Sequence, residues 1–513
     1  MKKLKLSIAA IVILVASSAE AQVPALDAYI ENVRKTFNVP GLSVAVVKDG
    51  VIVFAKGYGL RETGKPAATD SHTLFGIASN TKAFTATALA MLVEEGKVEW
   101  DKPVINYLPW FRLSDPYVTA ELTVRDLLVH RSGLGLGAGD LLWWPSSTYT
   151  RREIAERLRF LPLVTSFRSA YAYDNTLYLI AGELIEAVSG KTWEEFITQR
   201  IFAKVGMKES TVHFSASGNV ALPHAEINGV VKTVEPFASD NVNPPGGINS
   251  SAEDMARWMI VQLDSGRISK SERIFSRRSA NQLWSIVTPI PVNGDPPPEL
   301  AALKPSFNGY ALGFGIRDYR GKKIVSHTGG LPGYVSKVAM IPELKLGVVI
   351  LTNQESGSAF ESIAYRVMDS YLGAPATDWT AIFKKLSDRN QAGIKESDAQ
   401  ATAARNSKST PSLALSAYAG TYTDKWYGDI VIKQNGNALQ IDFTKTPALK
   451  GKLEHWQYDT FVVRWNDRDL RADAFITFSL SPGGKIDHAK MEAASPSVDF
   501  SFDFQDLNLI PKR

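Results

Sequence analysis

Hydrophobic and polar positions alternate in two runs near the start of the chain, on either side of a two-residue turn. The segment GLSVAVVKDGVIVFAKGYG at 41–59 has Asp49-Gly50 at its centre. An Asp-Gly pair between two β-branched runs is a strong signal of a β-hairpin. Three more strand-like runs follow one another at 322–330, 334–342 and 346–353. This pattern predicts an antiparallel sheet.

Segments with helical periodicity separate these runs. Ser250-Ser251 ahead of Glu253-Asp254 marks the start of one such segment. We therefore expect an α/β (α+β) fold in which helices flank the antiparallel sheet. The predicted helices cover residues 81–95, 123–129, 177–188 and 252–263.

The pattern changes after residue 377. Residues 378–411 are rich in Lys, Asp, Gln, Ala and Ser, and their hydrophobic positions fade after Ile394, as in a partly helical linker. Short alternating runs separated by Gly, Asn and Asp follow, which is typical of a small β-barrel or sandwich. We predict a main domain at 22–377, a linker at 378–411 and a barrel domain at 412–513.

The first 21 residues have the pattern of a secretory signal peptide. Three lysines precede an apolar stretch at 6–16 and an Ala-Glu-Ala tripeptide at 19–21. A membrane span needs about 20 apolar residues, more than this stretch has. We therefore expect cleavage before Gln22, no membrane anchor, and a mature chain that is periplasmic or secreted.

The composition is that of a globular protein and disfavours several classes of function. The chain has 45% hydrophobic and 21% charged residues, a formal net charge of +4 and no cysteine. Disulfide bonds and lipid attachment through cysteine are therefore excluded. No stripe of basic residues with interleaved aromatics is present, so we expect no nucleic-acid partner and a small-molecule or peptide substrate. We predict no cofactor and no metal. Whether the protein forms a homo-oligomer stays open.

Ser79 and Lys82 form the first motif with catalytic potential. They are separated by two residues at the start of a long helical pattern, and this spacing puts both side chains on one helix face. A buried lysine whose pKa is lowered can take the proton of a serine hydroxyl and make it a nucleophile. The alternative interpretation is a helix cap beside a solvated lysine.

Tyr173 and Asn175 form the second motif, just before the helix predicted at 177–188. A phenol close to an ammonium group can carry a proton, and an amide can bind both a substrate carbonyl and the lysine. Such a pair suits acyl transfer. The alternative is an aromatic-rich loop in which Asn175 caps a helix.

The third motif is His327-Thr328-Gly329-Gly330, on or beside a strand. Small residues there would let a substrate backbone lie against the strand edge, and the amide of Gly330 could face a developing oxyanion. His327 could orient a carboxylate or assist proton transfer. The alternative is a glycine turn with a hydrogen-bonded core histidine.

The three motifs in this order resemble the serine β-lactamase and penicillin-binding-protein superfamily. The resembling branch is the one shared by class C β-lactamases, family VIII-type esterases, D-aminopeptidases and S12-type peptidases. Three neighbouring segments strengthen the resemblance, which covers roughly residues 25–375: LTVRDLLVHRSGLG, NPPGGINSSAEDMARW and the hairpin before Ser79. The segments YAGTYTDKWYGDIVI and LEHWQYDTFVVRW resemble a lipocalin-like accessory domain.

The resemblance implies a role for each residue of the motifs. Ser79 would be the nucleophile, Lys82 its base partner and Tyr173 the proton shuttle. Asn175 would hold the substrate amide, and the backbone amides of Ser79 and Gly330 would form the oxyanion hole. His130 would belong to a structural loop.

His327 departs from the family pattern, which usually has a lysine at this position in a Lys-Thr-Gly triplet. A histidine near neutral pH binds a penicillin carboxylate only in part, so the sequence argues against efficient β-lactam hydrolysis. The leading hypothesis is a peptidase for small or unusual peptides that contain D-residues or come from a linearised cyclic peptide. The alternatives are a carboxylesterase, a weak β-lactamase or D-Ala-D-Ala carboxypeptidase, and a non-catalytic peptidoglycan-binding module. The loops LGAGDLLWWPSSTYT and 287–307 are expected to shape the cleft.

Overall fold

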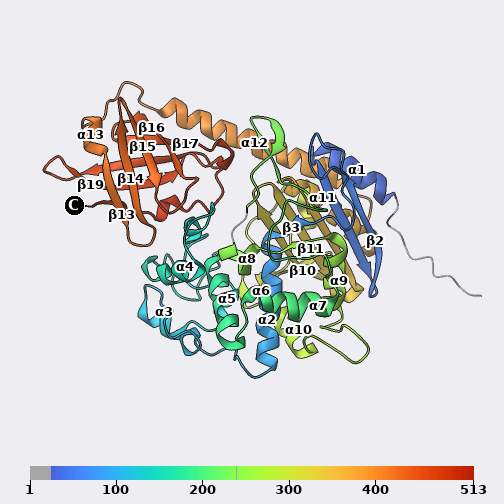
Figure 1. The fold of residues 1–513 in the computed structure, drawn as a ribbon. Helices are drawn as coiled ribbons and strands as arrows, with labels where there is room; N and C mark the ends of the chain where they lie inside the picture. Colours follow the sequence, from blue (N-terminus) through green and yellow to red (C-terminus); the bar gives the residue numbers. More distant parts are fainter. Residues whose placement is uncertain (1–22, 24, 238–239, 513) are drawn as a thin grey trace, which may run out of the picture.

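A computed structural model gives the fold of residues 23, 25–237 and 240–512 (Figure 1). The predicted signal peptide at 1–21 lies outside the described residues. An eight-stranded antiparallel sheet, ordered β2-β1-β12-β11-β10-β9-β8-β7, forms the centre of the larger domain. Its strands are β1 (Gly41–Lys48), β2 (Val51–Gly59), β7 (Thr288–Pro289), β8 (Asn308–Tyr310), β9 (Gly315–Tyr319), β10 (Lys322–Leu331), β11 (Tyr334–Ile341) and β12 (Leu346–Thr352).

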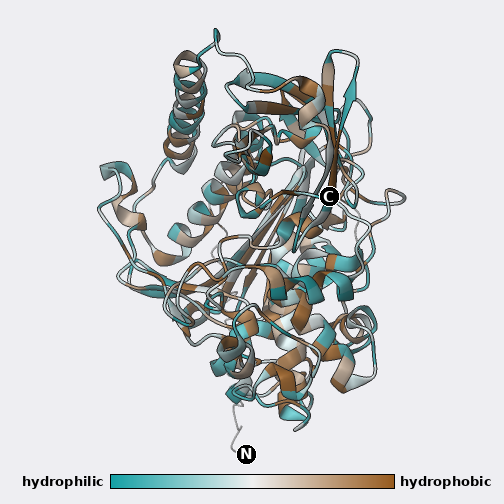
Figure 2. Cartoon of the chain, turned by 90° about the vertical axis from the view of Figure 1, so that its left-hand side faces the viewer, coloured by the Kyte–Doolittle hydropathy of each residue, from teal (hydrophilic) through white to brown (hydrophobic). Residues whose placement is uncertain are grey.

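Helices cover both faces of this sheet, and its central strands β1, β11 and β12 are buried almost throughout. Alternate residues of β1 belong to different cores. Val44 and Val46 belong to the core that holds α1 (Leu26–Thr36) and α11 (Gly357–Leu372). Ala45 belongs to the core that holds α2 (Thr81–Glu94) and α9 (Ala252–Leu263). This division follows from the period of two along a strand. Figure 2 shows the hydrophobic residues gathered on the central strands and on the helices against them.

The predicted hairpin and three of the four predicted helices are confirmed. Asp49 and Gly50 have φ values of 51° and 83°, as a type I′ turn requires. The helices are α2 (Thr81–Glu94), α5 (Thr176–Ser189) and α9 (Ala252–Leu263). Ser251 caps α9 by accepting a hydrogen bond from the backbone N–H of Asp254 at 3.2 Å.

The helix predicted at 123–129 is wrong, because only the short 3₁₀ helix η3 (Asp126–Leu128) forms there. The carboxylate of Asp126 accepts hydrogen bonds from the backbone and hydroxyl of Thr123, at 3.1 and 2.7 Å. Such local side-chain bonds compete with helix formation. His130 then ends the segment with a left-handed φ of 56°.

The C-terminal part forms the predicted barrel. Eight strands are ordered β19-β18-β17-β16-β15-β14-β13-β20, and a bridge between Ala489 and Leu509 nearly closes the ring. Trp426 and Tyr427 are buried inside it, as expected of core packing. The strands are β13 (Gly420–Asp424), β14 (Gly428–Asn435), β15 (Ala438–Phe443), β16 (Lys450–Gln457), β17 (Thr460–Trp465), β18 (Ala474–Leu480), β19 (Ile486–Ala493) and β20 (Ile510–Pro511).

One long helix, α12 (Trp379–Ala404), joins the two parts (Figure 1) and occupies most of the segment predicted as a linker. The remaining helices and strands are short. They are α3 (Pro116–Glu121), α4 (Arg151–Arg157), α6 (Trp193–Phe196), α7 (Ala203–Val205), α8 (Asn243–Gly246), α10 (Arg277–Leu283), α13 (Leu415–Tyr418), β3 (Phe75–Gly76), β4 (His224–Ile227), β5 (Val230–Thr233) and β6 (Asn249–Ser250).

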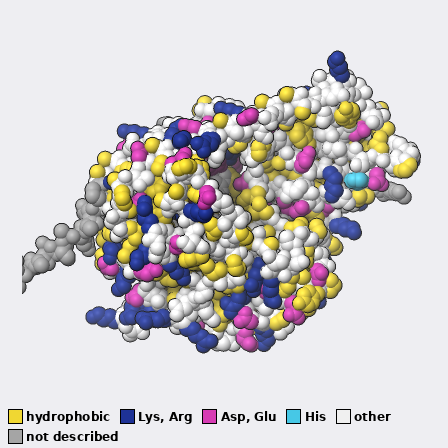
Figure 3. Space-filling view, turned by 180° about the vertical axis from the view of Figure 1, so that it is seen from behind, with side chains coloured by type: hydrophobic (Ala, Val, Ile, Leu, Met, Phe, Trp, Pro, Cys, Tyr) yellow, Lys and Arg dark blue, Asp and Glu magenta, His cyan; other side chains and the backbone are white. Residues whose placement is uncertain are grey.

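The surface mixes charges of both signs. Figure 3 shows basic and acidic side chains interspersed across one face of the molecule. Among the residues that the structure describes, no helix has the length and hydropathy that crossing a bilayer requires.

The buried carboxylate of Asp126 gives a test of what holds this fold together. Arg131 and Arg168 donate to it at 2.8 and 2.5 Å, and the side chain is fully buried. Burial raises its pKa, but the bonds from Arg168 and Thr123 outweigh burial and lower the pKa below its usual value. We expect Asp126→Asn to lower the free energy of unfolding by about 2 kcal/mol, because it leaves two guanidinium groups without their counter-charge.

The matched control is Asp101→Asn, since Asp101 also pairs with an arginine but its side chain is 76% exposed. The free energy of unfolding of this variant should fall by less than about 1 kcal/mol. A folded-state pKa below the unfolded one stabilises the fold at high pH, so the effect of Asp126→Asn should shrink as the pH falls below about 4. Urea denaturation followed by tryptophan fluorescence measures both, and equal losses in the two variants would contradict the assignment.

Candidate active site

The turn that carries Ser79 is the 3₁₀ helix η1 (Ala78–Asn80), directly before α2. Asn80 Nδ2 donates to Ser336 Oγ at 2.8 Å, and this hydroxyl donates to the carbonyl of Ile77 at 2.7 Å. Ser336 lies on β11, so two hydrogen bonds attach the turn to the central sheet. The sheet thereby fixes the position of the serine.

The two glycines of the third motif lie on β10 beside this turn. A Cβ atom on Gly329 would lie 2.2 Å from the carbonyl oxygen of Ile77, so only glycine allows the strand to approach so closely. A Cβ on Gly330 would meet nothing within 4 Å, and Gly330 lines the cavity next to Ser79. The strand edge therefore lies where the sequence predicted it, and the role of the Gly330 amide as an oxyanion donor stays a prediction.

The structure brings Lys82 and Ser79 together. Lys82 is fully buried, and its Nζ lies 3.0 Å from Ser79 Oγ. The same Nζ donates to Asn175 Oδ1 at 2.6 Å and to the carbonyl of Pro245 at 3.1 Å. Both partners accept only, so they hold two N–H bonds of the amine. In the neutral amine, the remaining lone pair then faces the serine hydroxyl.

Burial controls the charge of this lysine. Desolvation lowers the pKa of Lys82 from 10.5 to about 7, while the carboxyl groups of Asp140 and Asp174 act in the opposite direction. A substantial share of Lys82 is therefore neutral at pH 7. Such an amine can accept a proton from a neighbouring hydroxyl.

Tyr173 lies beside this pair. Lys82 Nζ lies 4.9 Å from the centre of the Tyr173 ring, and Ser79 is close enough to influence the pKa of the phenol. Burial raises the pKa of Tyr173 above the usual value for a phenol, so the hydroxyl keeps its proton at neutral pH. The ring of His130 packs against it at 4.3 Å, and His130 Nδ1 accepts from the backbone N–H of Asp174 at 3.1 Å.

Asn175 connects the lysine to a buried carboxyl group. Its Oδ1 accepts from Lys82, and its Nδ2 donates to Asp140 Oδ2 at 2.8 Å. These partners fix which way the amide faces, because the ammonium only donates and a carboxylate only accepts. The donor expected to hold a substrate is directed at Asp140 in this structure, and the substrate contact of Asn175 stays a prediction.

His327 lies on β10 with both ring nitrogens engaged. Nδ1 donates to the carbonyl of Thr328 at 2.6 Å, and Nε2 accepts from the hydroxyl of Tyr310 at 2.7 Å. Burial and the nearby Lys82 lower the pKa of His327 to about 3. The imidazole is therefore neutral at pH 7 and supplies no positive charge for a substrate carboxylate.

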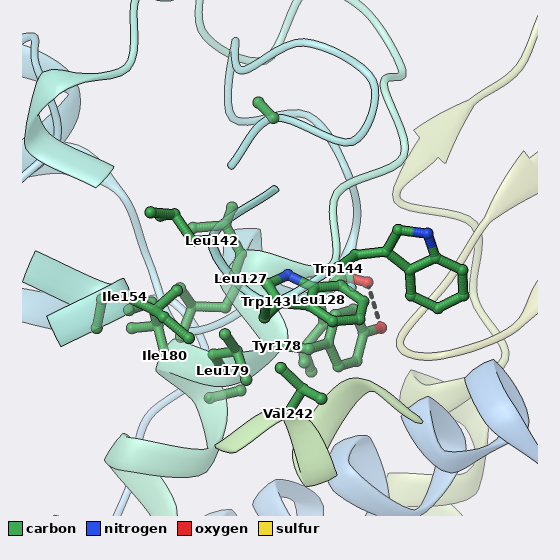
Figure 4. Packing of buried hydrophobic residues seen from close by; sticks show 14 of the residues in the cluster. Leu127, Leu128, Leu142, Trp143, Trp144, Ile154, Tyr178, Leu179, Ile180 and Val242 are labelled. Atoms are coloured by element: carbon green, nitrogen blue, oxygen red, sulfur yellow. Dashed lines mark hydrogen bonds between the residues drawn. The ribbon is translucent and has the colours of Figure 1, made fainter. Parts of the chain in front are cut away.

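A cavity of about 300 Å³ opens beside Ser79, and large aromatic residues form one of its walls. Trp144 and Phe237 stack at 5.1 Å. Figure 4 shows the indole ring of Trp144 at the side of the buried cluster to which it, Leu127 and Val242 belong. The wall consists of Trp143, Trp144, Phe214, Phe237 and Phe500.

The loop that begins with Leu136 shapes the cavity as predicted, because it supplies Leu136, Trp143 and Trp144. The loop 287–307 does not contribute to the lining, so this expectation is wrong; its Thr288 pairs with Tyr310 at the far edge of the sheet. Among the described lining residues there is no lysine or arginine, and the two charged ones are Asp240 and Asp499.

Sequence reasoning missed the residues that surround the lysine at a distance. Asp140 and Tyr310 stand in no recognisable motif, although Asp140 lies within a loop expected to shape the cleft. Phe500 and Ser501 come from the barrel domain, more than 300 positions after Tyr173 in the sequence. Among the described residues, no group of three or more His, Asp or Glu side chains is placed to hold a metal ion.

Two known proteins are similar in sequence to this chain over most of its length. Unguisins hydrolase ungD from Aspergillus violaceofuscus is 28% identical over 484 residues, which is 88% of this chain and 84% of that protein. Unguisins hydrolase ungD' from Aspergillus campestris is 30% identical over 442 residues, 81% of this chain and 79% of that protein.

A solved structure shares the overall fold. It is the octameric penicillin-binding protein homologue from Pyrococcus abyssi, with a TM-score of 0.58 and 23% identity over 94% of this chain and 99% of that one. Residues 404–511 match the family described as a domain of unknown function, DUF3471. Residues 26–372 match the family described as Beta-lactamase, and the chain therefore belongs to the β-lactamase and penicillin-binding-protein superfamily of serine hydrolases.

Proposed function

We propose that this chain forms an acyl-enzyme on Ser79 and hydrolyses small peptides, in particular peptides that contain D-residues or come from a linearised cyclic peptide. One observation carries the catalytic part: Nζ of Lys82 is buried, held by two acceptors, and 3.0 Å from Ser79 Oγ. This arrangement serves a base that removes a hydroxyl proton.

The same geometry provides a route for each proton. Ser79 Oγ attacks the substrate carbonyl carbon while its proton passes to Lys82 Nζ, and the new oxyanion faces the backbone amides of Ser79 and Gly330. As the C–N bond breaks, the hydroxyl of Tyr173 gives its proton to the leaving amine and regains one from Lys82. Water then attacks the acyl-enzyme by the reverse sequence of proton transfers, and Ser79 is restored.

The electrostatics of the cleft support a substrate without an essential carboxylate. His327 is neutral, and the described lining has two aspartates and no basic side chain. A penicillin carboxylate would therefore lack a cationic partner, whereas a neutral peptide or one with a free amine would not be repelled. The aromatic wall suits apolar side chains. The names of the two fungal relatives, which are hydrolases of unguisins, favour an unusual peptide.

The decisive test is digestion of a peptide library followed by mass spectrometry. The library should contain all-L, D-containing, linear and cyclic peptides, with nitrophenyl esters measured in parallel. We expect cleavage of D-containing or linear peptides by the wild type and none by Ser79→Ala. Hydrolysis of esters alone would replace the peptidase with an esterase, and activity retained by Ser79→Ala would remove Ser79 from its role.

Tyr173→Phe should lower kcat by at least about a hundredfold, the usual contribution of a general acid or base. Its matched control is Tyr171→Phe, because Tyr171 lies in the same loop and also packs its ring on His130, at 5.7 Å. The control should retain activity within a few-fold of the wild type. Comparable losses in the two variants would show that the Tyr173 hydroxyl carries no proton.

The rate of acylation should depend on pH through Lys82. Its pKa of about 7 means that the reactive neutral amine predominates above pH 7 and disappears below it. We therefore expect the second-order rate constant for labelling by a fluorophosphonate to fall about tenfold for each pH unit below this value. On the alkaline side, the raised pKa of Tyr173 means that the labelling rate should not change up to pH 9. A profile that stays flat down to pH 5 would exclude Lys82 as the base.

A further inference from the structure

Two side chains of the barrel domain contact one loop of the catalytic domain. The carboxylate of Asp503 accepts hydrogen bonds from the backbone N–H groups of Gly139 and Leu141, at 2.7 and 2.9 Å. These two residues flank Asp140. Asp503 is fully buried, so this contact belongs to the interior of the molecule. The barrel thus fixes the backbone on both sides of Asp140.

The second contact reaches the side chain of Asp140 itself. Ser501 Oγ donates to Asp140 Oδ2 at 2.9 Å, and the same oxygen accepts from Asn175 Nδ2 at 2.8 Å. The other end of the Asn175 amide accepts from Lys82 Nζ at 2.6 Å. An unbroken series of three hydrogen bonds therefore leads from the barrel domain to the proposed base. All four side chains are buried.

We propose that Ser501 is a positioning residue of the active site, which acts through Asp140 and Asn175 on Lys82. The inference rests on the proposed function of Lys82 as the base. It makes the C-terminal domain part of the catalytic machinery.

The physical reason is that Asn175 can hold Lys82 only while its amide faces the right way. An ionised Asp140 accepts from Nδ2 and so directs Oδ1 at the lysine, whereas a protonated Asp140 could donate to the amide instead. Burial raises the pKa of Asp140, and the hydrogen bonds from Asn175 and Ser501 oppose this rise. Asp140 Oδ1 has no hydrogen-bond partner among the residues that the structure describes, so each bond to Oδ2 matters more.

The other titratable groups near these four side chains are either acids, like Asp140, or neutral. Two acids, two phenols and two imidazoles act on the pKa of Asp140 or Lys82 or lie against Lys82. They are Asp174 and Asp503, Tyr173 and Tyr178, and His130 and His327. Burial lowers the pKa of both histidines well below neutrality, and the phenols keep their protons. Of these groups, Lys82 is the cation on which a change in charge at Asp140 acts. Asp499, which accepts from the backbone N–H of Ser501 at 2.9 Å, is a further acid beside the series.

The direction of the effect follows from these contacts. Loss of the Ser501 hydroxyl raises the pKa of Asp140, which makes this carboxyl group less often negative. The negative charge of Asp140 raises the pKa of Lys82, so its loss lowers the lysine pKa further. A serine that only joins two domains would not change the pH dependence of catalysis.

The test uses Ser501→Ala in the full chain, labelled by a fluorophosphonate between pH 5 and 9. We expect the plateau rate constant to fall about tenfold, the effect of one hydrogen bond to a charged group. The acid limb of the profile should move to lower pH. Ser501→Thr keeps a hydroxyl and should bring the acid limb back to its wild-type position.

The matched control is Ser497→Ala, in the same segment, since the Ser497 hydroxyl bonds only Ser495 among the contacts described. Its profile should equal that of the wild type. A Ser501→Ala profile that keeps its acid limb, or a Ser501→Thr profile that matches the alanine variant, would overturn the inference while leaving the proposed function intact. Absence of labelling in the wild type would overturn both.

Discussion

The site depends on one buried amine with three neighbours. Lys82 Nζ is within 3.1 Å of Ser79 Oγ, Asn175 Oδ1 and the Pro245 carbonyl. Burying a charged ammonium costs several kcal/mol, and three hydrogen bonds offset only part of this cost. The remainder appears as a pKa of about 7 in place of 10.5. The energetic strain on the charged form is therefore what makes the neutral, reactive form available.

The fold places the neighbours of this amine on separate elements. Ser79 comes from η1 and Lys82 from the start of α2. Pro245 comes from α8, and Tyr173 and Asn175 come from the loop before α5. Helices α2, α5 and α8 pack against one another, so a displacement of any of them would alter the site. The sheet adds β10, whose Gly329 lets the strand pass within contact distance of the serine turn. A rigid site is thus a property of the whole catalytic domain.

The sequence was sufficient where local patterns determine the structure. The Asp49-Gly50 hairpin, the cap at Ser251 and the pairing of Ser79 with Lys82 each depend on residues close together in the chain. It failed at 123–129, where hydrogen bonds between Thr123 and Asp126 replaced a helix. It also could not find Ser501, because the 361 positions that separate this residue from Asp140 carry no local signal of their contact.

The charge balance around Lys82 explains why a histidine suits position 327. A second cation at this position would lower the pKa of Lys82 further, since like charges disfavour each other's ionised form. With a neutral His327, the negative charge of Asp140 and Asp174 instead limits how far burial can lower the lysine pKa. The two acids and the neutral imidazole together leave Lys82 divided between its two forms near pH 7. This condition suits the proposed role of Lys82, in which the amine first takes the serine proton and later passes it on. A histidine in place of a lysine at position 327 then has two consequences. The described lining of the cleft has no lysine or arginine, and the pKa of Lys82 is not lowered by a second cation.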